Sequence, residues 1–383
     1  MIQSSFYNYF LYLCLFFITF SGNATLFEID FFTVIALVIL LFITAINQNK
    51  RLVVKCKFNT LLTLTFFFTM LILLYIKSVQ TEISYIEYSL WPIKVPILFL
   101  ILVFIKEAWS YKQTDHLRYL FFFTILGSAV FIISMLIFGD HSGGRISFIF
   151  GPNVLYRVLI FFILFMILML ALMKIKKRQK ILYSTILLLF LFYLLSVVGS
   201  RGGLVVLVIV LTLTFFLKYT SNFRFFAFLL LFSSIFILLA PDLFENSRTF
   251  SFQGIEQNIR IVFFLDFYEN ILEVPIFGYV WSDFEKYAVD GFIYPHNSAV
   301  ELIFYYGVLG VFTVAFIFYV AILAIVFFMK STFTPKLIVE YIYILLFLII
   351  LFSSFASGEL TDNFTIVSFA LYGFYYWKSD RVK

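Results

Sequence analysis

Long apolar runs with few or no charges constrain this chain more than any other feature of its sequence. A run of about 17 residues or more is long enough for a helix to cross the hydrocarbon core of a bilayer. Such a helix satisfies its own backbone hydrogen bonds where no water is available. The composition agrees, because 63% of the 383 residues are hydrophobic and 13% are charged, against about 25% charged in soluble domains. The sequence therefore predicts an all-α polytopic membrane protein.

The apolar runs predict about twelve transmembrane helices, which form a single integral membrane domain over residues 1–383. No basic residue precedes the first run, so we expect it to be retained as a span and not cleaved as a signal peptide. The expected spans are residues 6–22, 29–46, 59–76, 93–109, 117–138, 153–173, 181–199, 203–217, 224–240, 298–329, 340–355 and 363–377.

The basic residues predict the orientation of these spans. Of the 27 Lys and Arg, 19 lie in every second connection or at the C-terminus, while the other side carries acidic patches such as residues 359–362. Because basic connections stay in the cytoplasm, both termini are expected there. The distribution of the basic residues, and not the net charge of +6, is the informative feature, because it predicts how the spans are oriented in the membrane. No nucleic-acid partner is predicted.

The longest polar stretch, residues 241–297, is expected as a large outer loop between the ninth and tenth spans. Within it, NIRIVFFLDFYENILEVP (258–275) has the spacing of an amphipathic helix lying along the outer interface. The polar face would carry Asp266, Glu269, Asn270 and Glu273, and the apolar face would carry Phe264, Phe267, Ile271 and Arg260. An arginine on an apolar face needs a partner, which is either a carboxylate of the protein or a lipid-linked phosphate.

Further arginines lie on the expected outer face, and two of them stand beside glycines. GDHSGGRISFIFGPN contains Arg145 and Asn153, SVVGSRGG contains Ser200, Arg201, Gly202 and Gly203, and the large loop contains Arg248. Glycines permit a tight turn and close approach of a ligand to the backbone, and a guanidinium offers a planar fork to phosphate oxygens. The alternative interpretation of SRGG is an arginine that snorkels at a helix end.

The pair His296-Asn297 stands where the large loop meets the tenth span. Histidine is the usual general base near neutral pH. Asn297 is suited either to orienting the imidazole or to capping the helix that follows, and a simple helix cap is the competing interpretation of the pair. The only other histidine expected on the outer face is His141. The two histidines do not have the spacing of metal ligands, so no metal site is predicted.

These residues together suit attack of a hydroxyl on a sugar carbon that carries a lipid pyrophosphate. The arginines would hold the leaving group, and His296 would take the proton of the attacking hydroxyl. No nucleotide-binding loop is present, so no cofactor is expected and the donor would be energised beforehand.

Three motifs within residues 197–310 resemble the bacterial O-antigen polymerase and O-antigen ligase superfamily. In chain order they are SRGG, RIVFFLDFYENILEVPIFGY and HNSAVELIFYYGVLG. The resemblance implies a GT-C-like, metal-independent inverting glycosyltransferase of the bacterial inner membrane with a large periplasmic loop. Its donor would be an undecaprenyl-pyrophosphate-linked glycan. The matched motifs imply that Arg201 and Arg260 bind the pyrophosphate and His296 activates the acceptor, with Arg145 and Asn153 in support. The chain departs from the family where Tyr279 follows Gly278, since a second glycine is common there.

The acceptor distinguishes the two activities of this family. A polymerase extends a lipid-linked repeat unit and would have a chain-length regulator as a partner, whereas a ligase transfers the glycan to lipid A core. The divergent upstream half favours the polymerase. A transporter or flippase is the alternative of another class, and it would need polar groups near the middle of its spans. Arg157 is the main such group in the expected spans.

Overall fold

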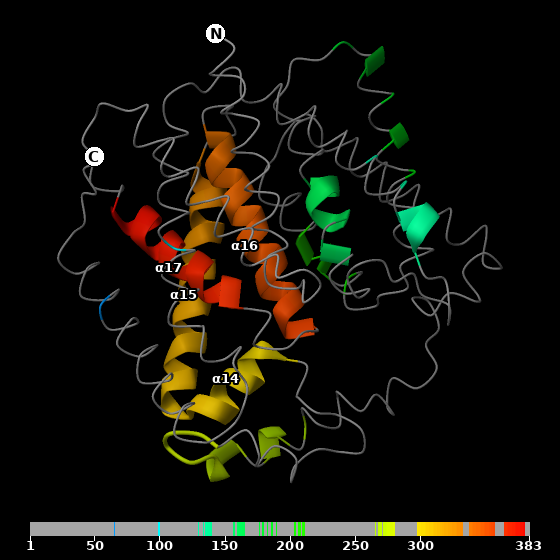
Figure 1. Cartoon of the computed structure of the whole chain (residues 1–383). Coiled ribbons are helices and arrows are strands. Elements are labelled where there is room, and N and C mark those ends of the chain that lie inside the picture. Colours follow the sequence, from blue (N-terminus) through cyan, green and yellow to red (C-terminus); the bar gives the residue numbers. More distant parts are fainter. Residues whose placement is uncertain are drawn as a thin grey trace, which may run out of the picture. The chain divides into compact units, whose positions relative to one another are not determined.

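A computed structural model of the chain describes residues 271–279, 297–331, 337–356 and 364–379, together with single residues and short stretches between 65 and 269. The described residues in regular secondary structure are helical, and no strand occurs among them (Figure 1). Two compact units are formed, one from residues 1–33, 109–252 and 328–349 and the other from the remaining residues. The helical content agrees with the predicted fold class, whereas most of the twelve expected spans lie outside the described residues.

Helix α15, Val308–Lys330, is the one described helix that is long and apolar enough to cross a membrane. Its 23 residues extend over about 35 Å at the rise of an α-helix, against about 30 Å of hydrocarbon. Large side chains such as Phe312, Phe318 and Ile322 are exposed along it. A helix whose apolar side chains face outwards in this way is typical of contact with lipid.

The expected span at 298–329 is not one continuous helix. It consists of α14, Ser298–Tyr306, followed by α15, and the two are separated at Gly307. Gly307 has φ +56° and ψ −129°, which lies outside helical geometry, and its N–H bonds to the carbonyl of Ile303. The prediction was wrong about this boundary because hydropathy continues across the break, whereas the backbone does not.

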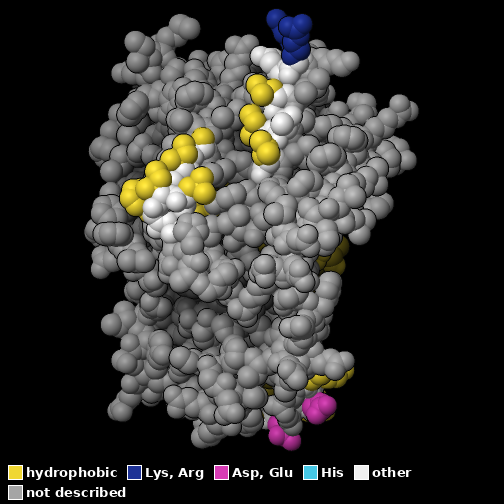
Figure 2. Space-filling model, turned by 90° about the vertical axis from the view of Figure 1, so that its right-hand side faces the viewer, with side chains coloured by type: hydrophobic (Ala, Val, Ile, Leu, Met, Phe, Trp, Pro, Cys, Tyr) yellow, Lys and Arg dark blue, Asp and Glu magenta, His cyan; other side chains and the backbone are white. Residues whose placement is uncertain are grey.

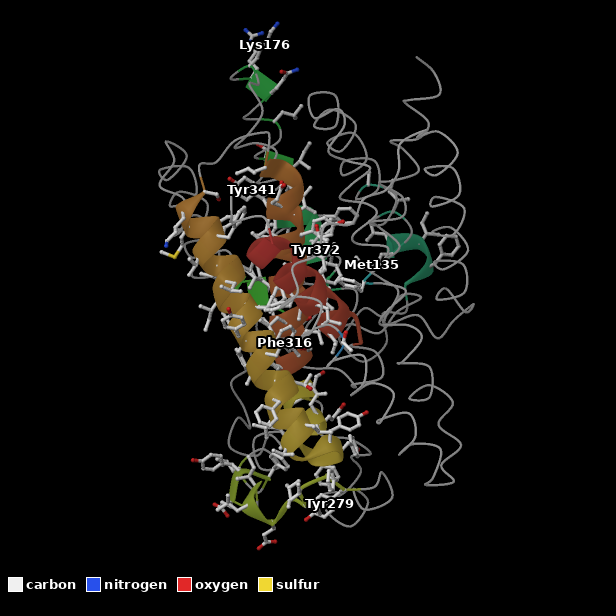
Figure 3. All side chains as sticks on the ribbon, turned by 90° about the vertical axis from the view of Figure 1, so that its left-hand side faces the viewer. Met135, Lys176, Tyr279, Phe316, Tyr341 and Tyr372 are labelled. Carbon is white, nitrogen blue, oxygen red and sulfur yellow. The ribbon has the colours of Figure 1, made fainter. Side chains whose placement is uncertain are left out.

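Helices α16, Ile338–Ala356, and α17, Phe364–Ser379, coincide closely with the spans expected at 340–355 and 363–377. Residues 341–351 of α16 are all buried, as is typical of a helix that is apolar all round and packed among others. Phe355 stacks on Phe318 with ring centroids 5.2 Å apart, and Phe374 of α17 lies 5.4 Å from Phe316. Figure 3 shows Phe316 on α15, where α17 lies beside it.

In the unit formed by residues 1–33, 109–252 and 328–349, Tyr341 contacts the end of α15. Its ring meets that of Phe328 edge-on at 5.4 Å, and its hydroxyl donates to Ser331 Oγ at 3.3 Å. Exposed apolar side chains of this unit include Ile133, Ile137 and Leu189. Figure 2 shows hydrophobic side chains of the described residues open on one face. Exposed apolar side chains of this kind agree with a membrane protein.

Candidate functional site

Asn297 is the N-cap of α14, so the helix begins directly after the His296-Asn297 pair. Its backbone is extended, with φ −144° and ψ 110°, and its side-chain oxygen accepts from the N–H groups of Ala299 and Val300 at 3.0 and 3.2 Å. The first backbone N–H groups of a helix have no partner within the helix, and an asparagine cap supplies one. The capping role considered for Asn297 is therefore confirmed.

The other end of the Asn297 amide makes a contact far away in the sequence. Its Nδ2 donates to the carbonyl oxygen of Phe355 at 3.1 Å. Phe355 lies in the last turn of α16, where carbonyl groups have no N–H partner within the helix. One side chain thus satisfies the start of one helix and the end of another, which fixes where α14 begins.

The second half of segment 258–275, which was expected to form the helix that carries Arg260, packs against α14. Phe267 is buried with Val300, Phe304 and Tyr305, and Ile271 and Val274 pack against them. The rings of Phe267 and Phe304 have centroids 6.3 Å apart. On the other side of the segment, Glu269 and Glu273 are exposed. At these residues apolar side chains are buried and acidic side chains are exposed, but Ile271–Glu273 form the 3-10 helix η2 and the helix does not continue to Pro275.

A short turn, PIFGY, joins this segment to the junction of α14 and α15. Gly278 has φ +76°, and its N–H bonds to the carbonyl of Pro275 at 2.8 Å. Tyr279 N–H donates to the carbonyl of Phe304 at 2.8 Å, and Val308 N–H donates to that of Ile276 at 2.9 Å. Added Cβ atoms at Gly278 and Gly307 would overlap backbone atoms of the facing segment. Two backbones therefore touch here, and only glycine fits at these two positions.

Tyr279 follows Gly278 in this turn. Its ring lies 4.7 Å from that of Phe304, and its hydroxyl donates to the carbonyl of Glu273 at 3.1 Å. Figure 3 shows Tyr279 in the segment next to the end of α15 that joins α14. Tyrosine at this position therefore leaves the turn formed and adds an aromatic contact.

Gly203, the last residue of SRGG, is covered by a side chain of the same unit. An added Cβ would overlap the ring of Tyr156, and Tyr156 is almost fully buried. Tyr156 follows the motif GGRISFIFGPN by three residues, and Arg157 beside it is also buried. The group that lies close to Gly203 in the structure is the ring of Tyr156 and not a ligand, and this contact brings the helix after Asn153 against the helix after Arg201.

The other expected site residues, His296, Arg201, Arg260, Arg145, Asn153, Ser200, Gly202 and Arg248, lie outside the described residues. Among those described, no group of three His, Cys, Asp or Glu side chains is placed to hold a metal ion.

Glu301 is a residue that the sequence interpretation missed. It lies in the first turn of α14 with 0% of its surface exposed, and Ser298 beside it is 1% exposed. An ionisable side chain is rarely buried so completely unless it is paired. The signal was a lone acidic residue within an apolar run, five positions after the histidine.

No protein-family model, no curated protein and no solved structure matches this chain.

Proposed function

We propose that this chain is a membrane glycosyltransferase that polymerises undecaprenyl-pyrophosphate-linked oligosaccharide repeat units at the periplasmic face of a bacterial inner membrane. The proposed enzyme has about twelve spans in a GT-C-like arrangement, with both termini in the cytoplasm. Its partners are the lipid-linked donor, a lipid-linked acceptor and a chain-length regulator. The same chemistry with lipid A core as acceptor makes a ligase, which the experiment below separates from the polymerase.

The reaction forms one bond and breaks one. The acceptor hydroxyl oxygen bonds to the anomeric carbon of the donor glycan, and the bond from that carbon to the pyrophosphate oxygen breaks. The electron pair leaves with the lipid pyrophosphate, whose growing charge is neutralised by Arg201 and Arg260. The hydroxyl proton passes to the imidazole of His296. Attack opposite to the leaving group inverts the anomeric configuration.

One observation supports this proposal most directly. The apolar face of segment 258–275, on which Arg260 is expected, contains Phe267 and Ile271, and these two residues pack against α14. Helix α14 begins at Ser298, directly after the pair His296-Asn297. An arginine on the same face as Phe267 is suited to meet a substrate beside that histidine.

The test is complementation of a strain that lacks the gene, with surface glycan separated on a gel. Wild type and His296→Ala are compared, and His116→Ala, expected on the cytoplasmic side, is the matched control. The amount of each variant in the membrane is measured alongside. Loss of a general base is expected to slow transfer by about 100-fold or more, whereas His116→Ala should restore the full glycan ladder.

The form of the defect identifies the acceptor. Core capped by a single repeat unit means that polymerisation has failed, as proposed. Bare core with accumulated lipid-linked glycan means that the enzyme is a ligase. A full ladder from His296→Ala would leave His296 with no part in the chemistry and would refute the mechanism.

A further inference from the structure

Segment 265–277 exposes large apolar side chains beside the junction of α14 and α15. Those with more than half of their surface exposed are Leu265, Tyr268, Leu272, Ile276 and Phe277, and Leu272 is 95% exposed. They are different residues from Phe267, Ile271 and Val274, which pack against α14. A single exposed apolar side chain is normal on a protein surface, but a group of them in one short segment marks a contact with another molecule or with a membrane.

The exposed apolar residues and the exposed acidic residues lie on different sides of this segment. Leu265, Tyr268 and Leu272 follow one another at intervals of three and four residues, and these intervals place side chains on one side of a helical segment. Glu269 and Glu273, which directly follow Tyr268 and Leu272, are exposed as well. The segment therefore has one apolar side against α14, a second apolar side that is exposed, and an acidic side.

The backbone connects this segment to the end of α15 that joins α14. The N–H of Val308, the first residue of α15, donates to the carbonyl oxygen of Ile276 at 2.9 Å. Val308, Val311 and Phe312, at the start of α15, are also exposed. Figures 1 and 3 show residues 271–279 next to this end of α15. The exposed apolar surface of α15 therefore extends to the residue that is bonded to Ile276.

The length of α15 determines the depth of the segment in a bilayer. The helix extends over about 35 Å, whereas the hydrocarbon core is about 30 Å thick and the bilayer with its headgroups about 40–45 Å. With Lys330, the last residue of α15, at one boundary, Val308 reaches the other, and the segment bonded to it lies among the headgroups. Amphipathic segments at this level bury apolar side chains about 5–10 Å deep, and tyrosine is favoured there.

We propose that Leu265, Tyr268, Leu272, Ile276 and Phe277 form an interfacial anchor that inserts into the phospholipid leaflet at the α14 end of α15. The acidic side of the segment faces water, because carboxylates are excluded from hydrocarbon. The anchor holds the junction of α14 and α15 at a fixed depth in the bilayer. This inference rests on the passage of α15 through the membrane and not on the proposed transfer reaction.

A second copy of this chain is the competing occupant of the exposed apolar side. Charged residues are depleted from the cores of protein interfaces, but Glu269 and Glu273 directly follow two of the anchor residues. Two copies that met through this side would bring their carboxylates together. A bilayer interface has no such conflict, because it offers water and hydrocarbon within a few ångströms of each other.

The experiment measures the surroundings of single side chains in the full-length protein, reconstituted in phosphatidylcholine vesicles. Cys14 and Cys56, the native cysteines, are replaced by serine, and a polarity-sensitive fluorophore is attached to Leu272→Cys or Phe277→Cys. Nitroxide-labelled phosphatidylcholine quenches the fluorophore from the membrane, and iodide on both sides of the vesicle quenches it from water. Glu273→Cys is the matched control, because Glu273 is adjacent to Leu272 and is exposed.

Fluorophores at Leu272 and Phe277 are expected to show a blue shift of emission, to lose intensity with the nitroxide lipid and to be protected from iodide. The fluorophore at Glu273 is expected to show the reverse, with strong quenching by iodide. A fluorophore at Phe312→Cys gives the reference response for contact with acyl chains, because Phe312 is exposed on α15.

Three results would overturn the anchor. Quenching by iodide at Leu272 and Phe277 as strong as at Glu273 would place the exposed apolar side in water. Protection of Leu272 and Phe277 from both quenchers would mean that protein covers this side, as a second copy would. Absence of lipid quenching at Phe312 would overturn the anchor together with the span on which it rests.

Discussion

Asn297 joins the start of α14 to the end of α16 through the carbonyl oxygen of Phe355, at 3.1 Å. The oxygen of the same amide caps α14. The amide makes both contacts through two separate atoms, an acceptor oxygen and a donor nitrogen. Asn297, the residue after the proposed catalytic histidine, therefore makes a contact with α16 in addition to capping α14.

Replacing Asn297 separates the two contacts. Asn297→Ser keeps a capping oxygen but removes the Nδ2 group that reaches Phe355, so a carbonyl in a partly buried place loses its partner, at a cost of about 1–3 kcal/mol. Asn297→Asp also keeps the cap but places a carboxylate against that carbonyl, and it is expected to cost more. Thermal unfolding of the purified protein should give Tm in the order Asn, Ser, Asp. An aspartate variant as stable as wild type would show that the contact with Phe355 contributes nothing.

Gly307→Ala should disrupt the junction between α14 and α15. Gly307 has φ +56°, and an added Cβ would overlap the carbonyl oxygens of Pro275 and Ile276. Strain at such a backbone position costs about 1–3 kcal/mol, and the overlap adds to it, so we expect a clear fall in Tm or in yield of folded protein. Val308→Ala is the matched control. It shortens an exposed side chain in the next position and keeps the backbone N–H that donates to Ile276, and a fall in Tm equal to that of Gly307→Ala would contradict the explanation.

The aromatic contact of Tyr279 is predicted to matter more than its hydroxyl. The hydroxyl donates to the carbonyl of Glu273 in an exposed place, so Tyr279→Phe should change stability by less than about 1 kcal/mol. Tyr279→Ala removes the ring that lies 4.7 Å from Phe304. Loss of an aromatic pair costs about 0.5–1.5 kcal/mol beyond the buried area. Thermal unfolding should therefore separate Ala from Phe, and equal Tm values for the two variants would refute this ranking.

The sequence was sufficient for elements whose physics is local. Helices α16 and α17 follow from uninterrupted apolar runs, and the cap at Asn297 follows from a short polar side chain before such a run. The exposed Glu269 and buried Phe267 follow from helical spacing within one segment.

Contacts between distant segments were not predictable in the same way. The break at Gly307 depends on where Pro275 and Ile276 lie, since glycine is compatible with a continuing helix. The packing of Tyr156 on Gly203 joins residues 47 positions apart. The sequence around a glycine does not indicate which side chain packs against it. The pairing of Asn297 with Phe355 is likewise a tertiary contact. Glu301 was recognisable in principle, because a single carboxylate in an apolar run requires an explanation.

The contact between Tyr156 and Gly203 predicts a specific suppression. Gly203→Ala places a methyl group where the Tyr156 ring lies, and overpacking a core costs about 1–3 kcal/mol. In a Tyr156→Ala background the ring is gone, so the same substitution should cost far less, with a coupling of about 0.5–3 kcal/mol between the two sites. Tyr156→Phe is the control, because it keeps the ring and should not relieve Gly203→Ala. Tm values of the single and double variants measure the coupling, and additive losses would mean that Gly203 is required for a reason other than this packing.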